Sequence, residues 1–148
     1  MKRQNGVYLF GVVKEWKVRR ASGERARGSD GLLPAVDLVV VTDAEAYGGH
    51  HPVVAYGRQA AEVIAFAETW RKAVEEGRVS GPLYVTVEGW LRSRGGHSVV
   101  VADGIHFSMP DAVRAEAKVL LNRLLRGAQK RAVVRADGRG GRGRGLGT

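Results

Sequence analysis

One helical segment interrupts a chain whose remaining folded part is patterned for β-strands. Before it lie three β-rich runs and after it two more, separated by turns rich in glycine and proline: 7–18, 34–42, 52–57, 82–92 and 98–107. Between residues 58 and 76 apolar residues recur every three or four positions, as one face of a helix requires: Ala60, Val63, Ile64, Ala67, Trp70 and Val74. The predicted order is therefore three strands, one helix and two strands.

This order restricts the fold, because five short strands around one helix must share a single core. The chain of 148 residues, with 44% hydrophobic residues, suits one domain plus a tail. A five-stranded Greek-key barrel with a helix between strands three and four is the OB-fold, whose open face and loops bind oligonucleotides. We therefore expect an all-β OB-fold over residues 1–109, with added helices.

The fourth β-rich run combines aromatic residues with arginines. Successive side chains of a strand point to opposite faces, so Leu83, Val85, Val87 and Leu91 are expected to line the core. Tyr84, Thr86, Glu88 and Trp90 then face away from it. Two aromatic rings outside the core, followed by Arg92 and Arg94, suit either stacking on bases or burial at a subunit contact.

Glycine and proline mark the ends of the predicted elements. Gly77 is placed to end the helix, and Tyr47-Gly48-Gly49 to form a turn. Pro52 is expected to open the third strand, because an interior proline would remove a hydrogen-bond donor from the sheet.

A second helix is predicted over residues 110–126. Pro110 suits the first turn, and an apolar stripe follows: Val113, Ala117, Leu120, Leu121, Leu124 and Leu125. The stripe can pack on its own barrel or on a second subunit, and the sequence does not choose between them. Residues 127–148 are expected to form a disordered basic Gly/Arg tail, with Arg139, Arg142 and Arg144 as nucleic-acid contacts.

The charge of the chain favours an anionic partner. The net charge is +9, of which the tail carries +5. The basic loop before the second strand adds Arg19, Arg20, Arg25 and Arg27, which can clamp a strand of nucleic acid together with Trp16 and Lys17.

Several other classes of protein are disfavoured. The chain has no cysteine, which excludes disulfides, thiolate zinc sites and a cysteine nucleophile. His50 and His51 are adjacent, so in an extended segment they cannot both bind one metal, and no phosphate-binding Gly-Lys-Ser/Thr loop occurs. The sequence also shows no membrane-spanning run and no signal peptide. We expect a cytoplasmic, nucleoid-associated protein that is not an enzyme, without a metal or other cofactor.

Three motifs, in the right order, resemble the bacterial single-stranded DNA-binding proteins. Residues 53–62, Val-Val-Ala-Tyr-Gly-Arg-Gln-Ala-Ala-Glu, are similar to the run that opens the helix in that family. Residues 85–94, Val-Thr-Val-Glu-Gly-Trp-Leu-Arg-Ser-Arg, are similar to its following strand, and residues 5–11 to its first strand. The resemblance covers most of residues 5–107 and suggests a divergent member.

The resemblance implies roles for individual residues. Tyr56 matches the family's base-stacking aromatic, and Arg58, Arg92 and Arg94 match its phosphate contacts. His50 stands near the place of a usual tryptophan, and Tyr47 is the nearest candidate for the aromatic after strand two. Trp90 replaces a residue that is commonly polar, and the acidic partner-recruiting tip of the family is absent.

The sequence thus predicts sequence-tolerant binding of single-stranded DNA in replication, recombination or repair, by a homo-oligomer, dimer or tetramer. Tyr56 and Trp90, with Trp16, Tyr47 and Tyr84, are the candidate stacking residues. Two alternatives stay open: an RNA-binding OB-fold protein, and a protein-interaction module that keeps the barrel. A small nuclease or hydrolase is a more distant one.

Overall fold

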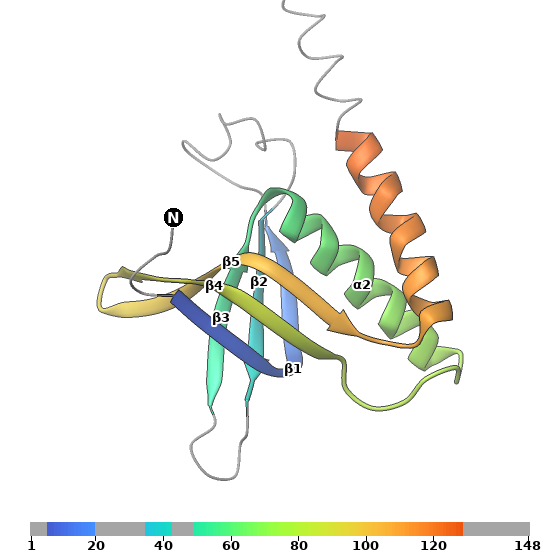
Figure 1. Ribbon diagram of the computed structural model, residues 1–148, viewed down its shortest axis with the longest axis horizontal. Helices are drawn as coiled ribbons and strands as arrows, with labels where there is room; N and C mark the ends of the chain where they lie inside the picture. Colours follow the sequence, from blue (N-terminus) through green and yellow to red (C-terminus); the bar gives the residue numbers. More distant parts are fainter. Residues whose placement is uncertain (1–5, 20–34, 43–48, 129–148) are drawn as a thin grey trace, which may run out of the picture.

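The computed structural model confirms the OB-fold. It describes residues 6–19, 35–42 and 49–128, with the side chain of residue 94 left aside. The strands β1 (Gly6–Arg19), β2 (Ala35–Val41), β3 (His50–Ala55), β4 (Tyr84–Arg94) and β5 (His97–Ser108) form a closed barrel in the order β1-β2-β3-β5-β4. Helix α2 (Gly57–Glu75) lies between β3 and β4, and a C-terminal helix spans residues 111–128 (Figure 1).

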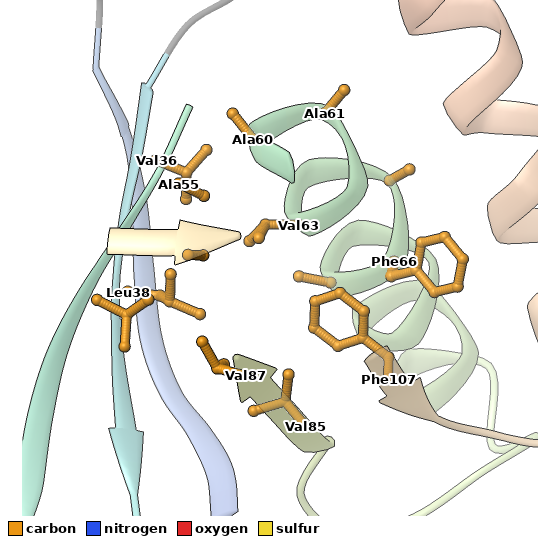
Figure 2. Packing of buried hydrophobic residues seen from close by; sticks show 14 of the residues in the cluster. Val36, Leu38, Ala55, Ala60, Ala61, Val63, Phe66, Val85, Val87 and Phe107 are labelled. Carbon is orange, nitrogen blue, oxygen red and sulfur yellow. The ribbon is translucent and has the colours of Figure 1, made fainter. Parts of the chain in front are cut away.

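The core lies between the inner face of the barrel and α2. Alternate strand residues such as Val36, Leu38, Val85 and Val87 are buried there, as their period-2 pattern requires. Helix α2 adds Ala60, Ala61, Val63 and Phe66, and the Phe66 ring stacks on Phe107 with centroids 5.3 Å apart (Figure 2). Each such valine or phenylalanine stabilises the fold by roughly 1.5 to 3 kcal/mol. The alternating residues of the strands and the apolar face of α2 therefore form one core.

Helix α2 ends as the sequence predicts. Gly77 has φ +74°, a left-handed conformation that glycine adopts without steric cost. Its N–H donates to the Val74 carbonyl at 3.0 Å, and the Arg78 N–H donates to the Ala73 carbonyl at 2.8 Å. These two bonds satisfy carbonyls that the end of the helix would otherwise leave unpaired.

The expectation for Pro52 is wrong. Pro52 lies inside β3, opposite Val39 of β2, rather than at the start of the strand. On its other side β3 pairs with β5 only at Val53 and Val54. Beside Pro52 that edge of β3 has no ladder partner in β5, so the missing N–H removes no ladder hydrogen bond there.

The predicted alternation of buried and outward-facing residues in the fourth strand is confirmed up to Val87 and is wrong at Leu91. Leu83, Val85 and Val87 are buried as predicted, whereas Leu91 is 40% exposed and outside the core. The β4–β5 ladder shifts register between Glu88 and Gly89, and pairing with β1 ends at Trp90. Among the described residues, Leu91 therefore has a strand partner only in β5, at Val100.

There is no room for a side chain at Gly89, where β4 bends. A Cβ at this position would lie 2.1 Å from the carbonyl oxygen of Val101, a backbone atom that cannot turn away. Without a side chain at Gly89, the backbones of β4 and β5 can approach closely at this bend.

The C-terminal helix packs on its own chain. Val113, Ala117 and Leu121 are buried, and the last two are part of the barrel core. The Arg114 guanidinium lies 5.9 Å from the Phe66 ring centre and donates to the Phe107 carbonyl. The sequence left this packing open, and the structure places the helix beside α2; it starts one residue later and ends two residues later than predicted (Figure 1).

Candidate nucleic-acid interface

The outer face of the barrel presents a row of residues that crosses all five strands. The ladder registers align Lys17 of β1, Asp37 of β2, Val54 of β3, Val101 of β5 and Trp90 of β4. Val54 and Val101 alternate with core residues and therefore face outward, yet they are only 1% and 5% exposed. The two valines form the floor of this face, beneath longer side chains.

Tyr56 stands where β3 passes into α2, two residues beyond Val54 of this row. Its backbone is extended, and Gly57, with φ +57°, then starts the helix. Arg92 of β4 donates from Nη2 to the Tyr56 hydroxyl at 3.2 Å, and its Cζ lies 5.9 Å from the ring centre. The tyrosine ring is half-buried and has a guanidinium beside it.

A second arginine reaches the same tyrosine. Arg19, the last residue of β1, donates from Nε to Oδ2 of Asp37 at 2.6 Å. The hydrogen bond with Asp37 raises the pKa of Arg19, and a smaller contribution comes from a side-chain hydrogen bond with Tyr56. We call Arg19, Asp37, Tyr56 and Arg92 the arginine–tyrosine cluster.

The cluster has a surplus of positive charge. It holds two guanidinium groups and one carboxylate, and Nε of Arg92 is buried without an acceptor among the described residues. A buried N–H without an acceptor costs free energy, which an incoming anion can recover. The arrangement therefore combines an aromatic ring with donors for an anionic group.

Other predicted contacts surround the cluster. Lys17 is exposed and lies opposite Asp37 in the β1–β2 ladder. Arg58, in the first turn of α2, is exposed and pairs with Glu62 at 3.4 Å. Burial raises the pKa of Glu62, and Arg58 partly offsets that shift.

His50 lies at the opposite end of β3 from Tyr56. It is exposed, and its Nδ1 is 3.3 Å from Nζ of Lys14. A strand that contacted both Tyr56 and His50 would have to follow β3 along its length.

Trp16 does not stand on the outer face. It pairs with Leu38, which is 2% exposed, and its ring packs against the barrel core. The bulge between Val13 and Glu15 shifts the alternation of β1 and turns Trp16 inward. Trp16 therefore contributes to the core, and the expectation that it stacks on bases loses its geometric support.

Tyr84 lies apart from the cluster, at the other end of β4. It is 45% exposed and stacks on Phe10 of β1, with ring centroids 5.8 Å apart and planes at 16°. Tyr8 and Phe10 are 66% and 55% exposed. We call Tyr8, Phe10 and Tyr84 the aromatic face.

No arginine or lysine lies directly opposite a ring of the aromatic face in the ladders of β1, β4 and β5. The registers place beside these rings only Val12, Thr86, Glu88, Gly104, His106 and Ser108. Along β4, Tyr84 is eight residues from Arg92, up to about 26 Å at the rise of a strand, and Tyr8 lies opposite Glu88, four residues from Arg92. The sequence analysis grouped Tyr84 with Trp90, whereas the structure separates them.

Several predicted contacts fall outside the described residues. These are Arg20, Arg25, Arg27, Tyr47, Arg139, Arg142 and Arg144, and for Arg94 only the backbone in β4 is described. Asp37 was missed by the sequence analysis. Its signal was a carboxylate in the middle of an otherwise apolar strand, Ala35–Val41.

Metal and membrane candidates were also sought among the described residues. There, no group of three or more histidine and acidic side chains is arranged to hold a metal ion. In the same part of the chain, no helix is long and apolar enough to cross a membrane.

Comparison with known proteins gives matches only among solved structures. No family model and no curated protein matches the chain. The SSB domain of a Synechococcus sp. protein is 20% identical, with a TM-score of 0.48 over 72% of this chain and 98% of that one. A small single-stranded DNA binding protein from Mycoplasma pneumoniae is 15% identical, with a TM-score of 0.42 over 74% and 97%.

A third similar structure is the dimeric N-terminal domain of PriB from Thermoanaerobacter tencongensis. It is 15% identical, with a TM-score of 0.44 over 73% of this chain and 100% of that one. The strand order β1-β2-β3-β5-β4 and the place of α2 between β3 and β4 identify the OB-fold.

Proposed function

We propose that this protein binds single-stranded DNA with little sequence preference, through the arginine–tyrosine cluster and the outer face beside it. The observation that carries the proposal is the convergence of Arg19 and Arg92 on Tyr56. Single-strand binders pair a stacking ring with cations that follow the phosphates. Sequence tolerance follows, since every base has a face on which a ring can stack.

In this mechanism Tyr56 stacks on one base, worth about 1 to 3 kcal/mol. Arg92 and Arg19 contact the phosphates on either side of that base. Trp90 lies on the same face and offers a second ring. Lys17, Arg58, Arg94, Tyr47 and His50 extend the path as candidate contacts.

The loop and the tail supply further charge in this proposal. Arg20, Arg25 and Arg27 lie within eight residues of Arg19 in the sequence and are candidate phosphate contacts. Arg139, Arg142 and Arg144 stand between glycines and can pair with phosphates. With about six phosphates contacted, the logarithm of affinity should fall with the logarithm of salt concentration at a slope near −4.

The resemblance of residues 53–62 and 85–94 to bacterial single-stranded DNA-binding proteins supports the same assignment. It suggests a role in replication, recombination or repair, and a cytoplasmic location at the nucleoid. No catalytic role is proposed for any residue.

The aromatic face supports self-association. Three exposed rings without a cation beside them in their strands suit an apolar partner better than a polyanion. We infer that a second copy of the chain covers them, giving a dimer or tetramer. A protein-interaction module would use this face for a different partner and would bind no nucleic acid.

Direct titration tests the proposal. Tryptophan fluorescence is followed while oligo-dT, an RNA of matched length and duplex DNA are added at two salt concentrations. We expect quenching by oligo-dT well below the concentration needed for duplex. Trp90→Phe, which removes the tryptophan of the outer face, should lose most of the signal and keep the binding curve measured by anisotropy.

The other outcomes separate the alternatives. Tighter binding of RNA than of oligo-dT would favour the RNA-binding alternative. Equal binding of all three would assign the affinity to the charge of the tail, which a chain ending at Ala128 would test. Absence of binding at low salt would refute the proposal.

A further inference from the structure

Asp37 places a negative charge inside a cluster otherwise suited to an anion. It is the one acidic residue of β2, whose other six residues are alanine, leucine or valine. Its Oδ2 accepts a hydrogen bond from Nε of Arg19 at 2.6 Å, and the two side chains are 39% exposed for Arg19 and 48% for Asp37. A solvent-accessible guanidinium is therefore already occupied in the free protein.

A carboxylate and a phosphate offer arginine the same kind of partner. Both are anionic oxygen acceptors that form charge-assisted hydrogen bonds with a guanidinium. Arg92, the second arginine of the cluster, donates instead to the neutral hydroxyl of Tyr56. Arg92 can therefore still pair with an anion, whereas Arg19 already pairs with the carboxylate of Asp37.

We propose that Asp37 limits the affinity of the site by competing with the phosphate of a bound strand for Arg19. In the free protein the carboxylate holds Arg19 beside Tyr56. When a strand binds, a phosphate takes the place of the carboxylate on Arg19. This inference rests on the proposed function and adds to it the residue that limits affinity.

The exposure of the ion pair between Arg19 and Asp37 determines how strongly Asp37 competes with a phosphate. An ion pair that is 40 to 50% exposed is weak, because water and salt screen it. A phosphate can therefore displace Asp37 at small cost, while the released carboxylate still repels the strand nearby. The pair reduces affinity without preventing binding, and it favours faster release of the strand.

The experiment compares Asp37→Asn with Glu75→Gln in the full chain. Both changes replace a carboxylate by its amide beside an arginine, since Glu75 accepts from Arg71 at 2.8 Å. Glu75 lies at the far end of α2 from Tyr56, about 27 Å away along the helix. The two variants therefore have the same net charge, but only Asp37→Asn releases an arginine of the cluster, since Arg71 keeps Glu68 as a partner.

We expect Asp37→Asn to bind oligo-dT about two- to fivefold tighter than the wild type, the effect of freeing an exposed ion pair. Its salt dependence should stay close to that of the wild type, because a phosphate contacts Arg19 in both complexes. Glu75→Gln should show only the smaller effect of net charge. Asp37→Glu keeps the carboxylate and should bind like the wild type.

A double variant tests whether Arg19 is the arginine that Asp37 controls. In an Arg19→Gln background, Asp37→Asn should no longer increase affinity beyond the Glu75→Gln control. Asp37→Ser is the second variant if the asparagine form melts early, with the same expected direction. Binding by Asp37→Asn equal to or weaker than that of a wild type that does bind oligo-dT would overturn the inference. A wild type that does not bind would instead refute the proposed function.

Discussion

The barrel carries aromatic rings on two regions of its outer surface, and the two regions differ in charge. Tyr56 of the arginine–tyrosine cluster has two arginines within reach of its hydroxyl. Phe10 and Tyr84 of the aromatic face stack on each other, and no arginine or lysine stands beside them in β1, β4 or β5. Exposed rings alone therefore do not distinguish the two regions. The arginines beside Tyr56 do.

Strand β4 connects the two regions and shows how they separate. It begins at Tyr84, in the aromatic face, and carries Arg92 of the cluster near its other end. Between them the β4–β5 ladder shifts register at Glu88 and Gly89. One strand thus contributes residues to both regions.

The largest expected effect comes from removing the ring of the cluster. Tyr56→Ala should weaken binding of a labelled oligo-dT by about 1 to 3 kcal/mol, or roughly 5- to 150-fold, because one base loses its stacking partner. The measurement is fluorescence anisotropy at fixed salt. Tyr56→Phe keeps the ring and should retain most of the affinity.

Tyr84→Ala is the matched control, because it removes the same side chain from the aromatic face. It should leave the affinity per subunit nearly unchanged. A comparable loss from both tyrosines would break the distinction between the two regions and return Tyr84 to the path of the DNA.

The second effect concerns association of subunits. Phe10→Ala should shift the oligomer toward monomer by about 1 kcal/mol or more, since buried aromatic residues dominate interface energies. Light scattering over a range of protein concentrations measures the change, with Tyr56→Ala as the control that should keep the oligomer. A wild type that is monomeric at all concentrations would contradict a self-associating aromatic face.

The elements that local patterns define were predictable from sequence. Strand alternation placed Val85 and Val87 in the core, and the helical period with Gly77 fixed the extent of α2 within one residue at each end. Tyr56 was found through a resemblance to known motifs, and the structure gives it arginine partners on two strands. The strand alternation, the helical period and the motif around Tyr56 depend on residues that are close in sequence, whereas the arginine partners of Tyr56 do not.

The errors arise where neighbours distant in sequence decide the outcome. Trp16 turns inward because of a bulge in β1, and Leu91 is exposed because pairing with β1 ends before it. The link between Arg19 and Asp37 joins residues 18 positions apart and requires the register of β1 with β2. A single sequence carries no local signal for such a register.

A third, smaller effect separates charge from position within the cluster. Arg92→Gln should make the salt dependence of binding shallower by about 0.7, the loss of one phosphate contact from a single strand. Arg92→Lys keeps the charge and should keep the slope. Arg123→Gln, on the exposed side of the C-terminal helix, is the matched charge control and should leave the slope unchanged. An equal change in both glutamine variants would mean that only net charge matters.

The smallest effect uses a contact remote from both regions as a reference. Glu116 of the C-terminal helix pairs with Arg78, and this hydrogen bond lowers the pKa of Glu116. Because the folded pKa lies below the unfolded one, the contact stabilises the protein above the unfolded pKa. The stabilisation is lost as the pH falls through the folded pKa.

The melting temperature of the wild type should therefore exceed that of Glu116→Gln at neutral pH by a small amount, and the difference should vanish in acid, below the ordinary glutamate pKa of about 4.3. Thermal unfolding followed by circular dichroism between about pH 6 and pH 3 measures it. Oligo-dT affinity at neutral pH should be the same for both proteins, since Glu116 belongs to neither region. A difference in melting temperature that persists unchanged into acid would mean that the glutamate acts through packing rather than through its charge.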